Sequence, residues 1–184
     1  MIYQFLTDED IQQQLKKDLL LDVLPDEKER LRKIKKAEGA AIKQVKAKSG
    51  KWYNTAALFI NIEQWKPDKL YPEGAHIYDV DTIYVCMVEN SNATPAENPD
   101  IWHESDPRHE LLVMYVTDML IYHLHSSVNP RKIPELRRDR YKEAIGWLEM
   151  IADHTENPDF PTLEDEEDDD GIIWGGNPQY DHYL

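Results

Sequence analysis

Residues 109–130, HELLVMYVTDMLIYHLHSSVNP, contain the clearest structural pattern in the chain. Apolar and aromatic side chains recur at helical spacing through this stretch, and the pattern ends at Asn129-Pro130, because proline does not continue a helix. The stripe consists of Leu111, Leu112, Tyr115, Met119, Tyr122 and Leu124. The stretch therefore predicts a long helix that buries one broad face against other helices.

A second helix is predicted directly C-terminal to the first. It begins near Pro134, since proline is favoured in the first turn of a helix, and it ends at about His154, before Asn157-Pro158. Trp147 lies beside its apolar stripe. The stripe consists of Leu136, Tyr141, Ala144, Ile145, Leu148 and Ile151.

Two further helices are predicted near the N-terminus. The first begins at Thr7, whose hydroxyl can cap it, places Ile11, Leu15 and Leu19 on one face, and ends at Pro25. The second runs from Asp26 to about Ser49-Gly50. Its apolar face consists of Leu31, Ile34, Ala41, Ile42 and Val45. Two helical hairpins pack most simply as one antiparallel bundle.

Residues 65–108 have a different composition, with five prolines and short β-branched or aromatic runs at 76–78 and 82–88. These runs predict two or three strands. We therefore expect a mainly α fold in which an antiparallel four-helix bundle, residues 1–64 and 109–155, carries a small β-rich insertion at 65–108. An extended acidic C-terminal tail is expected at 156–184.

The chain has 184 residues and a formal net charge of −15, but the charge is unevenly distributed. Residues 156–184 contain ten acidic residues and no lysine or arginine, whereas residues 26–51 contain ten lysines or arginines against four acids. A charge this negative argues against a protein that coats nucleic acid. Separate blocks of opposite charge can make a chain complementary to a copy of itself or to a charged partner.

An apolar segment follows the acidic tract 164–170. A tail that serves only solubility has no need of large apolar side chains, so we interpret them as anchors that dock into a partner. The predicted anchors are Ile172, Ile173, Trp174, Tyr180 and Tyr183.

Nothing in the sequence indicates catalysis. The chain lacks the G-x-S-x-G, P-loop and G-x-G-x-x-G motifs. His123 and His125 are two positions apart on a predicted helix, so their side chains point in different directions and cannot converge on one metal ion. Cys86, the single cysteine, lies in an apolar run where a buried, unreactive thiol is expected. We expect a protein that is not an enzyme and has no cofactor or metal site.

The same features bear on the compartment. One cysteine cannot form an internal disulfide framework and fits a reducing environment. No apolar run approaches the roughly 20 residues of a membrane span, and residues 1–10 lack the regions of a secretory signal. We expect no membrane partner.

Two stretches carry a family resemblance: residues 40–59, AAIKQVKAKSGKWYNTAALF, and residues 118–148, which follow the pattern D-hydrophobic-x-x-Y-H-L … R-Y-x-x-A-x-x-W-L. Together they resemble Mu-type phage head–tail connector proteins, also called adaptor or head completion proteins. These are small helical proteins that form a ring under the portal. The resemblance covers the predicted helices and, loosely, the tail.

The resemblance implies a bacteriophage virion protein at the head–tail junction, made in the host cytoplasm. Such a protein would form a ring, of twelve copies on the family pattern, that docks on the portal and continues the DNA channel to the tail. DNA would pass through the ring without specific binding. In this setting the C-terminal anchors would bind the portal or a neighbouring subunit, and the insertion would contact tail or further connector proteins. The predicted electrostatic subunit contacts are Arg32, Lys35, Lys36 and Lys43.

The insertion has a resemblance of its own. Its pattern of Trp65-x-Pro67, Tyr71-x-x-Gly74-x-x-Ile77 and Thr82-x-Tyr84 resembles small chitin-binding-type carbohydrate modules, although Asp79-Val80-Asp81 replaces the usual glycine-bearing turn. Two alternatives therefore stay open: a carbohydrate-binding module on a helical scaffold, and a DNA-binding accessory protein that uses residues 28–48. The candidate surface residues of the module are Trp65, Tyr71, Tyr84 and Trp102.

Overall fold

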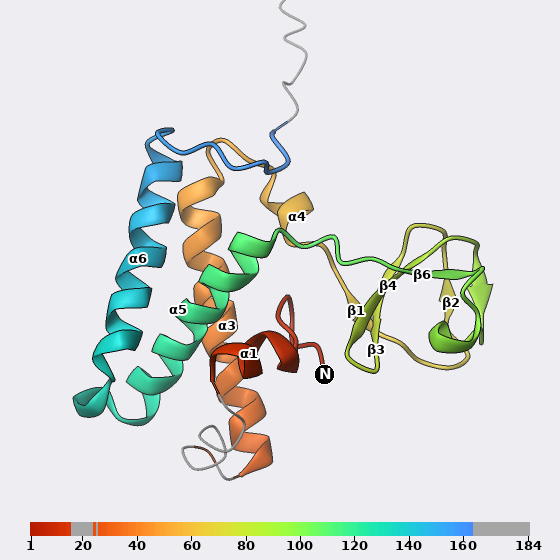
Figure 1. Cartoon of the computed structure of the whole chain (residues 1–184), viewed down its shortest axis with the longest axis horizontal. Coiled ribbons are helices and arrows are strands. Elements are labelled where there is room, and N and C mark those ends of the chain that lie inside the picture. Colours follow the sequence, from red (N-terminus) through yellow and green to blue (C-terminus); the bar gives the residue numbers. More distant parts are fainter. Residues whose placement is uncertain (16–23, 25, 164–184) are drawn as a thin grey trace, which may run out of the picture.

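The computed structural model describes residues 1–15, 24 and 26–163 (Figure 1). Within these ranges the chain forms a helical part and a β-rich module. The helices are α1 (Asp8–Gln14), α3 (Glu27–Ser49), α4 (Thr55–Leu58), α5 (Glu110–Val128) and α6 (Glu135–Ala152). None of the helices described is long and apolar enough to cross a membrane.

The three long helices, α3, α5 and α6, pack against one another and form the main core. Helix α5 is the most buried, as its apolar sequence predicts, and it contacts both of its long neighbours. Helix α3 is capped at its N-terminus by Asp26, whose side chain accepts a hydrogen bond from the backbone N–H of Glu29 at 2.7 Å. The helices predicted from the sequence over residues 26–50, 109–128 and 134–154 are therefore present.

The predicted four-helix bundle is nevertheless wrong. Among the described residues, the first predicted helix is represented only by α1, which has seven residues and spans about 10 Å. It lies across α5 and does not run alongside the long helices (Figure 1). Leu19, part of the predicted apolar stripe, lies outside the described residues. The second reason is the sheet described next, which makes the fold mixed α/β and not mainly α.

The β-rich module contains a four-stranded mixed sheet and a separate two-stranded one. The larger sheet has the order β1-β3-β4-β6, and its strands are β1 (Glu63–Gln64), β3 (His76–Asp79), β4 (Thr82–Cys86) and β6 (Trp102–Glu104). Strand β1 pairs parallel to β3, whereas β4 pairs antiparallel to both β3 and β6. The smaller sheet pairs β2 (Leu70–Tyr71) with β5 (Asn90–Ser91). The module thus has more strands than the two or three predicted.

A tight turn joins β3 to β4. Val80 and Asp81 have φ values of 40° and 65°, the left-handed conformation that a tight two-residue hairpin requires. This turn fixes the register, which places Asp79 opposite Thr82 and Ile77 opposite Tyr84.

The N-terminal segment joins the module to the helices. Ile2 is buried with Ile62, Tyr78 and Ile83 in a small cluster that includes residues of the central strands β3 and β4. At the other end of the described chain, Phe160 is buried against the helical core. The first residues of the predicted tail therefore remain attached to the body of the protein.

The C-terminal attachment is specific. Phe160 makes edge-to-face ring contacts with Tyr53 and Trp147, at centroid distances of 5.4 and 5.9 Å. Thr162 forms a β-bridge with Tyr53, and the backbone N–H of Leu163 donates to the carbonyl of Trp52 at 3.4 Å. The chain therefore leaves the described body beside the C-terminal end of α3 (Figure 1).

Candidate functional site

The N-terminal half of α3 presents a basic surface because its apolar residues face the core. Ile34 and Ala37 are buried, whereas the four cationic residues predicted as subunit contacts are all exposed. These four, Arg32, Lys35, Lys36 and Lys43, make no ion pair with any residue in the described ranges. Their charges are available to a partner.

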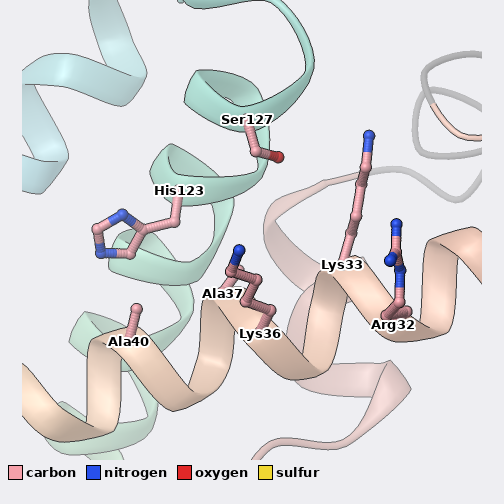
Figure 2. A pocket seen from close by; sticks show the side chains of 7 residues that line it. All are labelled: Arg32, Lys33, Lys36, Ala37, Ala40, His123 and Ser127. Atoms are coloured by element: carbon pink, nitrogen blue, oxygen red, sulfur yellow. The ribbon is translucent and has the colours of Figure 1, made fainter.

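A pocket of about 410 Å³ lies between this surface and the C-terminal half of α5 (Figure 2). We call it the basic pocket. Two of the predicted contact residues line it, Arg32 and Lys36, whereas Lys35 and Lys43 do not. The full lining is Arg32, Lys33, Lys36, Ala37, Ala40, His123 and Ser127. The small side chains of Ala37 and Ala40 leave space between the two helices.

Three residues of the lining, Lys33, His123 and Ser127, are not among those predicted from the sequence. Lys33 could have been predicted from the sequence, because it lies on the same helix face as Ala37 and Ala40, at spacings of four and seven residues. His123 and Ser127 are far away in the sequence, and only the packing of α5 on α3 brings them to the pocket.

The basic pocket is electrostatically one-sided. No carboxylate lines it, and of its three cations only Lys33 has an ion-pair partner in the described chain, Glu29 at 3.0 Å. Burial lowers the pKa of His123, so the imidazole is neutral near pH 7 and the positive charge comes from α3. The pocket can therefore accept an anionic group such as a carboxylate or a phosphate.

His123 is held in place by contacts behind the pocket. Its Nε2 lies 3.1 Å from Gln44 Oε1, and Gln44 Nε2 donates to the hydroxyl of Tyr141 at 3.0 Å. Because the Gln44 amide nitrogen is used by Tyr141, its oxygen accepts from the Nε2–H of His123. This chain of hydrogen bonds links α5, α3 and α6 and orients the His123 imidazole at the pocket.

The residues that carry the connector resemblance meet at the interface between α5 and α6. Asp118 is buried and lies 3.4 Å from a guanidinium nitrogen of Arg140. The rings of Tyr122 and Tyr141 stack with centroids 4.0 Å apart and an interplanar angle of 15°. Several residues of the sequence pattern over 118–148 therefore form contacts between α5 and α6.

Two of the four candidate surface residues in the β-rich module are misassigned. Trp102 and Tyr71 are 1% and 2% exposed, and their rings pack edge to face at 5.5 Å. The indole N–H of Trp102 donates to the carbonyl of Ala93 at 2.9 Å. Trp65 and Tyr84 are half-buried and pack against the same cluster. A module this small needs its large aromatic side chains as core, so Tyr71 and Trp102 belong to the core of the module and not to a binding surface.

The remaining predictions divide between described and undescribed residues. Cys86 is buried, and burial raises the pKa of its thiol. In the ranges that the structure describes, no cluster of three or more His, Cys, Asp or Glu side chains could hold a metal ion. The acidic tract 164–170 and all five predicted anchors, Ile172, Ile173, Trp174, Tyr180 and Tyr183, lie outside the described residues.

The chain matches no protein-family model, no curated protein and no solved structure.

Proposed function

We propose that this chain is a structural subunit of a phage virion, a head–tail connector that assembles as a ring and docks on the portal. The observation that carries the proposal is the separation of charge. On α3, Arg32, Lys35, Lys36 and Lys43 have no ion-pair partner within the described chain. The same sequence contains an acidic tract of seven consecutive residues at 164–170.

A ring explains why both charges belong to one chain. Subunits in a closed ring meet through two different surfaces, so a subunit needs a patch and its complement at separate places. In this chain the basic pocket lies toward the N-terminal end of α3, whereas the acidic tract follows Leu163, which is bound beside the C-terminal end of α3. Opposite charges also favour the correct register between neighbours.

The packing of α5 and α6 supports the same proposal. The resemblance to connector proteins rests on residues such as Asp118, Tyr122, Arg140 and Tyr141, which are far apart in sequence. Asp118 contacts Arg140, and Tyr122 contacts Tyr141. Such contacts are expected if the resemblance reflects a shared way of packing these helices.

Negative-stain electron microscopy with purified portal protein tests the proposal. We expect rings of this protein attached to the portal, with twelve copies on the family pattern. If the protein forms no ring and does not attach to the portal, the proposal is wrong. A monomer in the absence of portal is compatible with it, because docking can drive the assembly.

DNA binding is the second candidate, because the basic pocket could also take a phosphate group. The net charge of −15 and the absence of Phe, Tyr and Trp from the pocket lining count against it. Retention of the full-length protein on immobilised DNA, with a steep loss as salt is raised, would favour this candidate over the connector.

A further inference from the structure

We infer that the basic pocket between α3 and α5 binds the acidic tract 164–170 of a second copy of this chain. The inference rests on the proposed ring, of which this would be the contact between neighbouring subunits. The occupant is a segment of the chain itself, so no additional partner is needed.

Charge and size match in this pairing. The tract contains only Glu and Asp, and no lysine or arginine occurs between residues 156 and 184. The pocket offers the cations of Arg32, Lys33 and Lys36 and no carboxylate. A volume of about 410 Å³ admits carboxylate side chains, while the rest of the tract would lie along the exposed surface of α3.

The spacing of the cations also fits an extended acidic segment. Arg32 and Lys36 are one turn apart on α3, about 6 Å along the helix axis. Alternate side chains of an extended chain are about 7 Å apart and lie on the same side. Two alternate carboxylates of the tract can therefore meet these two cations together. Figure 2 shows both basic side chains on the face of α3 that is turned toward Ser127 of α5.

The acidic tract of a second copy fits the basic pocket better than the tract of the same chain. Leu163 is bound at Trp52, just beyond the C-terminal end of α3 at Ser49. Along the helix, Lys36 lies about 20 Å from that end and Arg32 about 25 Å. A seven-residue tract reaches at most about 25 Å when fully extended. The tract could bring only its last residues to its own pocket, whereas the tract of a neighbour has no such limit.

The contact depends on repetition. A single exposed ion pair contributes little to binding and is weakened by salt. In a ring every subunit both gives a tract and receives one, so many weak contacts act together. We therefore expect the isolated pairwise contact to be weak and sensitive to salt.

Disulfide trapping in the full-length protein tests the inference. One chain carries Ser127→Cys, at the pocket, and a second chain with a tag of different mass carries Asp168→Cys, in the tract. Under mildly oxidising conditions at low salt we expect a disulfide-linked pair of the two different chains. Adding Arg32→Glu and Lys36→Glu to the first chain should reduce the yield at least tenfold.

The matched controls use residues outside the pocket. Arg138→Glu with Lys66→Glu makes the same charge change away from α3, and most of the linked pair should remain because neither residue lines the pocket or belongs to the basic surface. Ser91→Cys, exposed in β5, should not link to Asp168→Cys. The native Cys86, which every variant keeps, is buried, and each variant incubated alone shows the background of linkage.

The outcomes separate the inference from the connector proposal. The inference is overturned if no linked pair forms, or if Arg32→Glu and Lys36→Glu do not reduce its yield. It is also overturned if a chain that carries both introduced cysteines forms the disulfide only within itself. If rings form on the portal without the linked pair, the pocket contact is wrong and the connector proposal stands. If the pair forms but the protein does not bind the portal, the contact stands and the connector proposal fails.

Discussion

The carboxylate of Glu38, fully buried on α3, accepts a hydrogen bond of 2.8 Å from the backbone N–H of Leu6. The same Oε1 atom accepts from the N–H of Phe5 at 2.8 Å, and Oε2 accepts from that of Gln4 at 3.0 Å. One side chain therefore satisfies three backbone donors and fixes the N-terminal segment that connects the helices to the β-rich module.

Glu38→Ala should lower the free energy of unfolding by about 3 kcal/mol, because three backbone N–H groups lose their acceptor. Glu38→Gln should cost less, about 1 kcal/mol, since the amide oxygen can still serve Phe5 and Leu6 while the NH₂ group opposes the N–H of Gln4. Urea unfolding followed by circular dichroism measures both. Glu143→Ala, an exposed acid on α6, is the control, and an equal loss in Glu38→Ala and the control would contradict the role of Glu38.

The stability of the protein should fall as the pH drops below about 6.5, in part through His123. Burial lowers its pKa in the folded state, so the unfolded chain binds the proton more readily and acid favours unfolding. Replacing His123 by Gln should flatten the loss of stability between pH 7 and pH 5. Urea midpoints at the two pH values give the measurement.

His76 provides the comparison, because burial also lowers its pKa but it lies in the β-rich module. The variant His76→Gln should keep the part of the pH dependence that belongs to His123. If His123→Gln leaves the slope unchanged, the imidazole is not held neutral in the way that we describe.

Trp102→Ala should destabilise the protein by about 4 kcal/mol, because it empties the centre of the β-rich module. Trp65→Ala should cost clearly less, since that ring is half-buried. Unfolding curves of the two variants make the comparison. Equal losses would mean that Trp102 is not the centre of the module. Because Trp102 is buried, a loss of glycan binding in Trp102→Ala would not by itself identify a sugar site.

Deleting residues 171–184 should weaken attachment to the portal without changing the pocket contact. The deletion removes all five predicted anchors but leaves the acidic tract in place. Counting ring-bearing portals in negative stain measures the effect. Unchanged attachment would show that these side chains are not anchors.

Long stripes of apolar residues made α3, α5 and α6 predictable. The short strands were not, because two-residue elements such as β1 and β2 carry no measurable periodicity, and the parallel pairing of β1 with β3 depends on a distant contact. Trp65 and Trp102 look alike in sequence, and only the sheet decides that Trp102 faces inward. For the pocket, the cations Arg32 and Lys36 were found from charge, whereas His123 and Ser127 required the placement of α5 on α3.

The most direct test of the account mixes two full-length variants. One variant has Arg32→Glu and Lys36→Glu and keeps its tract, and the other keeps its pocket but has every acid of 164–170 changed to its amide. The intact tract of the first variant can bind only the intact pocket of the second. A mixed pair therefore has a single pocket–tract contact, and no third subunit can add to it. The single contact is weak, so sedimentation velocity is run at low salt and high protein concentration. It should then show each variant alone as a monomer and the mixture as a dimer that dissociates at high salt. A mixture that stays monomeric, or a pocket variant that associates on its own, would contradict the account.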